Sequence, residues 1–295
     1  MQAEYFLGVD GGGSHTRVMV VDADGNVVYR QQGGPSNVLV VGEERAAQSL
    51  ADALGQWHGP VAGAVLGMAG ADREPVARYW RSLAQRYWDT RILVVGDYRI
   101  AWAAFTRLQP GVIGIFGTGS VVYGERGSTS VKVGGHGWRL GDDGSGLEIG
   151  RLAVNAALAA LEGWGPRTTL VEEVLAWSQV GSAADLISRL YDRAFDWRRL
   201  ADLAPAVISA HPTDAVARDI VAQQGQLVVR QLARVYETLF QPESASIGLS
   251  GGLATFWADW VKPLWPYPVA RLEVVEREPV WGAAEWARQL FGAGL

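Results

Sequence analysis

The strongest constraint on the fold of this 295-residue chain is a motif that occurs twice. Gly8-Val-Asp-Gly-Gly-Gly-Ser14 aligns with Gly114-Ile-Phe-Gly-Thr-Gly-Ser120, and apolar segments flank both copies. Each copy is typical of a strand, a glycine turn and a second strand. Because the spacing is much longer than that of a solenoid repeat, we interpret the motif as a duplication of one domain topology. The sequence therefore predicts two domains, with the boundary near Gln109-Pro-Gly111.

The hydrophobic pattern around each copy predicts a mixed sheet flanked by helices, which is an α/β architecture. In the first domain, residues 1–111, we expect strands at 5–9, 17–21, 27–30, 61–66 and 91–95, and helices at 43–57, 75–87 and 98–108. In the second, residues 112–280, we expect strands at 112–116, 121–124, 129–133, 246–249 and 269–275, and helices at 145–162, 213–240 and 253–261, with further helices between 162 and 210. A final helix at 281–291 is expected to pack back on the first domain.

The composition excludes several classes of protein. The chain has no cysteine, which excludes disulfides, thiolate metal sites, iron–sulfur clusters and a cysteine nucleophile. The formal net charge is −5 without a basic block, which argues against nucleic acid as the main partner. The longest apolar run, 61–71, is far shorter than the roughly 20 residues of a membrane helix, and residues 1–13 lack the basic start of a signal peptide. We therefore expect a cytoplasmic protein without a membrane partner.

The glycine turns are suited to binding phosphate, because glycine lets backbone N–H groups approach an anion closely. A strand rather than a helix follows the first copy, which excludes a dinucleotide-binding fingerprint. Neither Lys132 nor Lys262 follows a glycine, which excludes a Walker A loop. A third cluster, Gly248-Leu-Ser-Gly-Gly252, ends a strand and opens a helix, an arrangement that suits a nucleotide. An ordinary hairpin turn explains the first motif equally well, and close helix–strand packing is the alternative for the third.

One acidic residue follows the last expected strand of the first domain. Asp97 lies after the strand at 91–95 and directly before a helix. Ligands of open α/β sheets bind at the carboxyl ends of the strands, so Asp97 is a candidate general base. Capping of the helix that follows is an equally good interpretation from the residues alone.

Together these motifs resemble the N-acetylglucosamine kinase-like (BadF/BadG/BcrA/BcrD ATPase) family of the actin/Hsp70/sugar-kinase superfamily. A fourth segment, Gly134-Gly-His-Gly-Trp-Arg-Leu-Gly-Asp-Asp-Gly-Ser-Gly146, is similar to the family's GGWG-x-x-LGDEGS sequence, with His136 in place of Trp and Asp143 in place of Glu. The resemblance covers essentially the whole chain. It implies an actin-like (ribonuclease H-like) fold of two duplicated domains with a cleft between them. Because the chain has no cysteine, the iron–sulfur branch of the family is excluded and the sugar kinases are favoured.

The resemblance implies that the chain binds ATP and Mg²⁺. Asp10 would face the phosphates through Mg²⁺, because a carboxylate repels phosphate unless a cation lies between them. Capping of the glycine turn is the alternative role for Asp10. Thr118 and Gly119 would cradle the β- and γ-phosphates. The complete expected nucleotide site consists of Gly11, Gly12, Gly13, Ser14, Thr16, Gly117, Thr118, Gly119, Gly251 and Gly252.

The resemblance also implies an amino-sugar substrate. Asn37 matches the family's sugar-binding asparagine, and we expect Trp138 and Asp142 to contact the sugar together with Asp97 and Gly119. The implied reaction moves the γ-phosphate of ATP to the 6-hydroxyl, with Asp97 as general base. N-acetylglucosamine is the first expectation, and glucosamine and N-acetylmuramic acid are close alternatives. A regulatory ATPase without a sugar substrate is the alternative function. Exposed aromatic residues are compatible with a homodimer.

Overall fold

The computed structural model describes residues 4–55, 57 and 59–292, and these residues form two compact units. Unit 1 contains the described residues of 1–111 and 275–295, and unit 2 contains residues 112–274. Unit 1 is therefore built from both ends of the chain, whereas unit 2 is one continuous segment. Among the helices of the described residues, none is long and apolar enough to cross a membrane.

Unit 1 is organised around a five-stranded sheet in the described part of the chain, with the order β3-β2-β1-β4-β5. The pairs β1–β2 and β2–β3 are antiparallel, and the pairs β1–β4 and β4–β5 are parallel. Four of the five strands, β1, β3, β4 and β5, therefore run in the same direction, and their carboxyl ends meet at one edge of the sheet. The strands are β1 (Tyr5–Gly11), β2 (Thr16–Asp22), β3 (Val27–Gly33), β4 (Gly63–Met68) and β5 (Arg91–Gly96).

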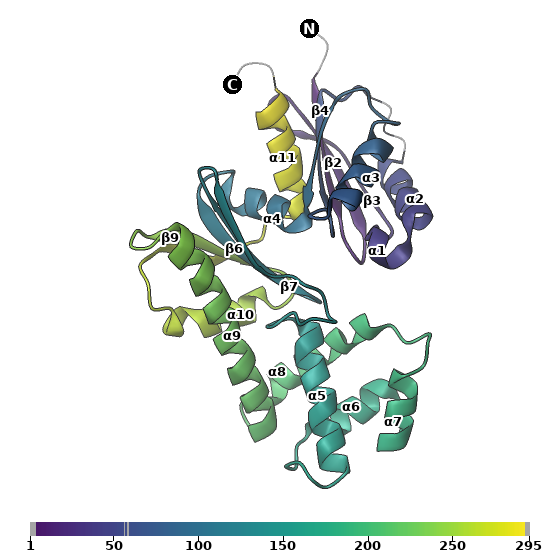
Figure 1. Ribbon diagram of the computed structural model, residues 1–295, viewed down its shortest axis with the longest axis vertical. Helices are drawn as coiled ribbons and strands as arrows, with labels where there is room; N and C mark the ends of the chain where they lie inside the picture. The colour runs from purple at the N-terminus through teal and green to yellow at the C-terminus, as the bar shows by residue number, and fades with distance from the viewer. Residues whose placement is uncertain (1–3, 56, 58, 293–295) are drawn as a thin grey trace. The chain divides into compact units, whose positions relative to one another are not determined.

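Two apolar cores cover the opposite faces of this sheet, because successive side chains of a strand point to opposite sides. Leu7 and Val9 pack with α2 and α3, whereas Phe6 packs with α4 and α11. Figure 1 shows α2 and α3 on one side of the sheet and α11 on the other. The last helix lies so close to β1 that a Cβ on Gly8 would be 2.3 Å from the backbone nitrogen of Ala284. The helices of unit 1 are α1 (Val38–Val41), α2 (Glu43–Leu54), α3 (Glu74–Ala84), α4 (Asp97–Thr106) and α11 (Pro279–Phe291).

Unit 2 repeats the same sheet topology. Its strand order β10-β9-β6-β7-β8 matches that of unit 1 when β6 is set against β1, with parallel β6–β9 and β9–β10 pairs and an antiparallel β7–β8 pair. The duplication predicted from the two glycine motifs is confirmed. The strands are β6 (Gly111–Phe116), β7 (Ser120–Arg126), β8 (Thr129–Gly134), β9 (Ala245–Ser250) and β10 (Val269–Val274).

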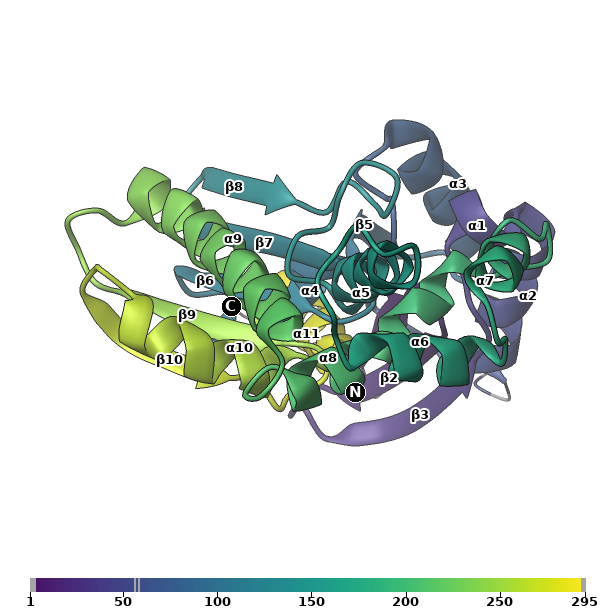
Figure 2. The same cartoon turned by 90° about the horizontal axis from the view of Figure 1, so that it is seen from below.

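The helices of unit 2 form one continuous apolar core with its sheet. The long helix α9 packs across β7 and β8 (Figure 2). A group of shorter helices lies between α5 and α9 in the sequence; α6, η1 and α8 pack on α5, and α7 packs on α6. The elements are α5 (Gly146–Leu161), α6 (Leu170–Ser178), α7 (Ala183–Leu190), η1 (Trp197–Leu203), α8 (Ala204–Ala210), α9 (Ala215–Leu239), α10 (Ala254–Val261) and η2 (Lys262–Leu264).

Candidate active site

The first glycine turn joins β1 to β2 and is tied to the segment that follows β3. The backbone nitrogen of Gly12 donates to the carbonyl of His15 at 3.0 Å. The carbonyl of Gly12 accepts hydrogen bonds from the backbone nitrogens of Ser36 and Asn37, at 3.0 and 3.2 Å. The structure therefore brings the expected phosphate turn and the expected sugar residue Asn37 together. Thr16 is fully buried and its hydroxyl donates to the carbonyl of Gly34 at 2.8 Å, which gives this side chain a structural hydrogen bond.

Asp10 is a nearly buried carboxylate directly before this turn. Its side chain is 14% exposed, and Nη1 of Arg17 lies 3.3 Å from Oδ2. Burial and the negative charge of Asp97 raise the pKa of Asp10 to about 6, although Arg17 opposes the rise. Glu278, which precedes α11, also raises the pKa of Asp10, by less than Asp97 does. Asp10 is thus a carboxylate whose charge is only partly compensated by the described side chains around it.

The sheet register places Asp97 on the same edge as Asp10. Asp10 pairs with Gly67 of β4, and Gly67 pairs with Val95 of β5, two residues before Asp97. Two strand spacings separate the β1 and β5 backbones at this level by roughly 10 Å. Asp97 is half-buried at the start of α4, and one of its oxygens accepts the backbone N–H of Tyr98 at 3.0 Å.

Asp72 is a third carboxylate near this edge, and the sequence analysis did not identify it. It lies in the loop after β4 and accepts a hydrogen bond from the hydroxyl of Tyr98 at 2.6 Å. This bond ties the β4–α3 loop to the first turn of α4, beside Asp97. The local signal was present, because Asp72 follows the buried strand β4 as Asp97 follows β5.

Asn37 is held by two backbone segments. Its Oδ1 accepts the backbone N–H of Leu39 at 3.1 Å and thereby caps the short helix α1. Its own backbone N–H is the donor to Gly12 described above. In the described part of the chain the amide nitrogen of the side chain has no hydrogen bond, so it is free to meet a hydroxyl or carbonyl of a ligand.

In unit 2 the second glycine turn is braced by the start of α5. Gly117 donates to the carbonyl of Gly119 at 2.9 Å, and the carbonyl of Gly117 accepts the backbone N–H of Gly146 at 2.7 Å. The carbonyl of Thr118 accepts the backbone N–H of Leu147 at 3.2 Å. Thr118 and Gly119 are themselves exposed, so the turn is rigid and accessible.

The third glycine cluster lies against this second turn. A Cβ on Gly251 would be 2.4 Å from the carbonyl oxygen of Phe116, and Leu253 donates to the same carbonyl at 2.9 Å. The space beside Gly252 is open, with Gly117 close by. The structure therefore brings together the expected nucleotide residues of the chain's second half.

Asp142 also joins the second turn. It is buried, and its Oδ1 accepts a hydrogen bond from the backbone N–H of Gly137 at 3.0 Å. Its Oδ2 lies so close to Gly119 that a Cβ added there would be 3.0 Å away. Burial raises the pKa of Asp142, while the Gly137 hydrogen bond and His136 oppose the rise. The carboxylate expected to contact the sugar is thus fixed beside the turn expected to contact phosphate.

A buried clamp positions the loop that carries Asp142. The backbone nitrogen of Gly144 donates to Oε1 of Gln224 at 2.7 Å, and its carbonyl accepts Nε1 of Trp257 at 2.8 Å. The sequence around Gly144 does not predict these partners, because Gln224 lies 80 residues from Gly144.

Trp138 lies at the exposed tip of the same loop and is 40% exposed. Its ring stacks on that of Trp197 with centroids 5.7 Å apart and an interplanar angle of 8°. The guanidinium of Arg139 lies 5.1 Å from the centre of the Trp138 ring. One aromatic face of this tryptophan is therefore engaged within unit 2, which anchors the loop tip to η1.

The carboxylates of unit 1 fit a magnesium ion bound with a nucleotide. No group of three or more histidine, aspartate or glutamate side chains among the described residues is placed to hold a metal alone. Mg²⁺ typically uses one or two carboxylates and completes its shell with water and substrate phosphates. The single under-compensated carboxylate of Asp10 beside an expected phosphate turn has this donor chemistry.

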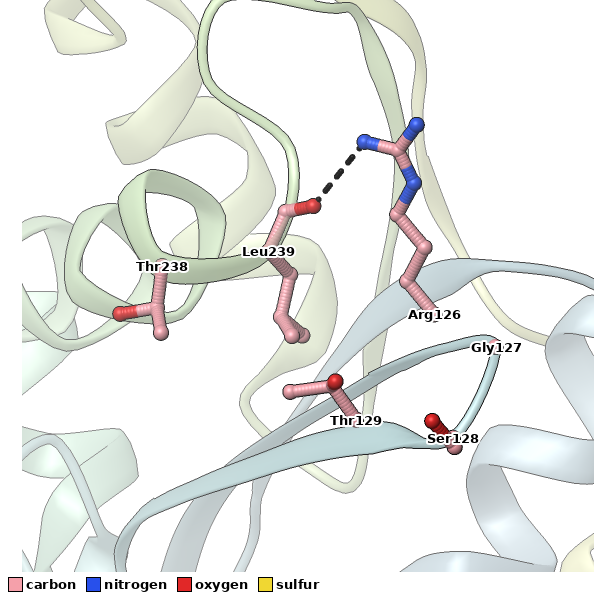
Figure 3. A pocket seen from close by; sticks show the side chains of 6 residues that line it. All are labelled: Arg126, Gly127, Ser128, Thr129, Thr238 and Leu239. Carbon is pink, nitrogen blue, oxygen red and sulfur yellow. Dashed lines mark hydrogen bonds between the residues drawn. The ribbon is translucent and has the colours of Figure 1, made fainter.

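A surface cavity of about 490 Å³ lies at the β7–β8 hairpin of unit 2, and none of the residues described above lines it. Figure 3 shows Arg126 reaching from this hairpin to the carbonyl of Leu239, at 3.1 Å. The same guanidinium also pairs with Glu243 at 2.8 Å, so its charge is already used within unit 2. The lining residues are Arg126, Gly127, Ser128, Thr129, Thr238 and Leu239.

Comparison with known proteins identifies relatives along most of the chain. The model of the BadF/BadG/BcrA/BcrD ATPase family matches residues 7–287. An N-acetylmuramic acid/N-acetylglucosamine kinase of Clostridium acetobutylicum is 31% identical over 264 residues, which cover 85% of each chain. An N-acetyl-D-glucosamine kinase of Dictyostelium discoideum is 31% identical over 229 residues, or 70% of each chain. A crystal structure from Chromobacterium violaceum, provisionally assigned as an N-acetylglucosamine kinase, has a TM-score of 0.81 at 24% identity and covers 97% of this chain and 99% of that chain.

Proposed function

The chain belongs to the BadF/BadG/BcrA/BcrD ATPase family, and from that premise we propose that it is an ATP-dependent kinase of an amino sugar. The observation that carries the proposal is the electrostatic coupling of Asp10 and Asp97 at one edge of the unit 1 sheet, beside the first glycine turn. A phosphoryl transfer to an alcohol needs one carboxylate for the metal and another that accepts the hydroxyl proton. We propose that Asp10 takes the first of these roles and Asp97 the second.

The relatives narrow the acceptor to amino sugars. The two curated kinases that match this chain at 31% identity act, by their names, on N-acetylglucosamine or N-acetylmuramic acid. We propose N-acetylglucosamine as the substrate, with phosphorylation at the 6-hydroxyl. Asn37 supports this choice, since its side-chain amide nitrogen can donate to a sugar oxygen. Asp142 is suited to accept a hydrogen bond from a sugar hydroxyl.

In the proposed reaction the protein mainly positions the two reactants and neutralises the negative charge of the phosphates. Backbone N–H groups of the turns at Gly11–Ser14 and Gly117–Gly119 would bind phosphate oxygens. Asp10 would hold Mg²⁺, which when bound neutralises charge on the transferring phosphoryl group. Asp97 would accept the proton of the sugar hydroxyl. At the same time the oxygen of that hydroxyl would bond to the γ-phosphorus, and the bond between the γ-phosphorus and ADP would break.

The test is the release of ADP from ATP in the presence of separate amino sugars. N-acetylglucosamine, N-acetylmuramic acid and glucosamine would be compared with a sugar-free reaction and with glucose. The expected result is a rate that depends on an amino sugar, with the phosphorylated position identified by NMR of the product. ADP release that no sugar stimulates would contradict the kinase proposal and favour a regulatory ATPase.

A further inference from the structure

We propose that Asp72 and Tyr98 are positioning residues, which fix the proposed general base Asp97 relative to the first glycine turn. This inference rests on the proposed kinase function. Neither residue belongs to the motifs that the sequence analysis singled out. Their role follows from two links of the β4–α3 loop, one to the start of α4 and the other to the end of β1.

The first link runs through Tyr98 to the carboxylate of Asp97. The hydroxyl of Tyr98 donates to Oδ1 of Asp72 at 2.6 Å, and the backbone N–H of Tyr98 donates to Oδ1 of Asp97 at 3.0 Å. A hydrogen bond of this length from a hydroxyl to a carboxylate is in the range of charge-assisted bonds, which are about twice as strong as neutral ones. The residue that hydrogen-bonds the proposed base is therefore itself held from the neighbouring loop.

The second link joins the same loop to β1, directly before the phosphate turn. The backbone nitrogen of Ala69, the first residue after β4, donates to the carbonyl of Gly11 at 2.8 Å. Two residues further on, the backbone nitrogen of Arg73 donates to the carbonyl of Gly70 at 3.1 Å, and Asp72 lies inside this turn. The loop therefore connects the strand of the proposed metal ligand with the helix of the proposed base.

Gly96 allows the side chains of Asp72 and Tyr98 to meet. Its φ of −61° and ψ of 144° are accessible to any residue, so the backbone conformation does not require glycine here. A Cβ on Gly96 would lie 2.5 Å from Cε1 of Tyr98 and 2.9 Å from Oδ1 of Asp72. The ring and the carboxylate thus fill the space that another side chain would take directly before Asp97, and this close packing restricts their movement.

The start of α4 depends on such support. The first N–H groups of a helix have no partners within the helix, and helix ends fray. Gly96 is the N-cap residue and provides no side-chain hydrogen bond to these groups, while Asp97 is the first residue of the helix. The bond between Tyr98 and Asp72 therefore holds the turn that carries the proposed base. A displacement of about 1 Å can lower the rate of an enzyme by about 10²-fold, so this bond should affect turnover.

Steady-state kinetics with an amino sugar test the proposal. Tyr98→Phe keeps the ring and removes the bond, Asp72→Ala removes its acceptor, and Asp72→Asn keeps an oxygen that can accept it. We expect the first two variants to lower kcat about tenfold to hundredfold, with KM for ATP and for the sugar within about twofold of wild type. The double variant should lose no more than either single one, because both break the same interaction. Asp72→Asn should keep most of kcat.

Tyr123→Phe is the matched control. Tyr123 of β7 is buried, and its hydroxyl donates to Oε2 of Glu125 at 2.5 Å, so this variant breaks the same kind of bond among residues that have no role in the proposed site. It should keep the kcat of wild type. Urea unfolding of each variant gives the folded fraction to which its kcat is referred, which separates a lost position of the base from a lost fold.

Two results would overturn the proposal and leave the kinase function intact. One is a wild-type kcat in Tyr98→Phe and Asp72→Ala. The other is a kcat of Asp72→Asn as low as that of Asp72→Ala, because the charge of Asp72 and not its bond to Tyr98 would then explain the loss. A wild-type protein that no amino sugar stimulates would instead overturn the kinase proposal, and this inference with it.

Discussion

At the scale of single residues, the fold of unit 1 opposes the charge that the proposed chemistry requires of Asp10. Its pKa is raised from 3.8 to about 6. The folded state therefore holds the proton more tightly than the unfolded chain, and stability is lost as the pH rises through this interval. Above about pH 6 the whole penalty is present, and it amounts to about 3 kcal/mol. A buried carboxylate with this cost is typical of a residue retained for function rather than for stability.

Asp10→Asn should therefore stabilise the protein while it weakens the binding of Mg·ATP. At pH 8 we expect the free energy of unfolding to rise by up to about 3 kcal/mol, because the neutral amide removes the cost of ionisation. The gain should shrink as the pH falls toward 5, where wild-type Asp10 is largely protonated. Urea unfolding at both pH values checks this, and a variant less stable than wild type at pH 8 would contradict it. The same variant should bind N-acetylglucosamine much as wild type does.

Asp97→Asn separates catalysis from binding at the second carboxylate. Loss of the proposed general base should lower kcat about 10²–10⁴-fold, while the affinity for Mg·ATP stays close to that of wild type. The substitution also removes a negative charge that raises the pKa of Asp10, so that pKa should fall toward its ordinary value. Carboxyl NMR of Asp10 measures this second effect. Asp52→Asn, at an exposed position of α2, is the control, and equal losses of turnover and nucleotide affinity would make Asp97 a structural residue.

At the scale of elements, the segment between β8 and α5 depends on backbone conformations that few residues adopt. Gly137 and Gly144 have φ values of +88° and +79°. A Cβ on Gly137 would meet nothing within 4 Å, whereas a Cβ on Gly144 would lie 2.4 Å from Cγ2 of Val228 and 3.2 Å from the ring of Phe116. The two glycines share a conformation and differ in packing, which makes them a matched pair.

Alanine at these two positions should have unequal effects. Gly137→Ala should lower the free energy of unfolding by about 1–2 kcal/mol, the cost of a left-handed backbone. Gly144→Ala adds the cost of overpacking to the backbone cost, so its free energy of unfolding should fall by about 2–5 kcal/mol in total. It should also raise the KM for the sugar, because the loop that carries Asp142 must move. Urea unfolding and sugar kinetics provide the measurements, and equal losses of stability would show that packing at Gly144 is unimportant.

Local signals explain which elements could be predicted. The strands of unit 1 were predicted because their apolar runs are bounded by turn residues. The helix expected at 43–57 ends at Leu54, since Gly55 adopts a φ of +52°. Helix α1 was not predicted, because four consecutive apolar residues at 38–41 show no helical periodicity. Helix α1 forms because the side chain of Asn37 caps it, while the backbone N–H of Asn37 donates a hydrogen bond to the first glycine turn.

In the candidate site, contacts between residues close in sequence could be predicted, whereas contacts between distant residues could not. Arg17 lies seven residues from Asp10, and both flank a recognised turn, so the pairing could have been predicted from hairpin symmetry. The clamp of Gln224 and Trp257 on Gly144 spans 80 and 113 residues, and no local pattern encodes such a contact. The assigned roles of the site residues remain predictions that the experiments above address.

At the scale of the whole molecule, the two units differ in how the chain builds them. Unit 2 is complete once residue 274 is present, but unit 1 also requires α11 from the other end of the chain. Helix α11 contributes the fully buried Val280, Ala283, Ala284 and Ala287 to the core that contains Phe6 and Val65. Unit 1 therefore cannot bury this face of its sheet until α11 is present.

Truncation should consequently affect the two units unequally. A chain that ends at Glu278 lacks α11 and exposes the large side chains of Phe6, Met19 and Val65, each worth about 1.5–3 kcal/mol when buried. This loss is comparable to the whole stability of a domain, about 5–15 kcal/mol, so unit 1 should unfold. Limited proteolysis should then cleave residues 4–111 rapidly, while residues 112–274 stay resistant. A chain that ends at Gly292 keeps α11 and is the control. Resistance of residues 4–111 in the shorter chain would mean that β1–β5 with α2, α3 and α4 form a sufficient core, and that α11 is an addition to unit 1 and not a part of its folding unit.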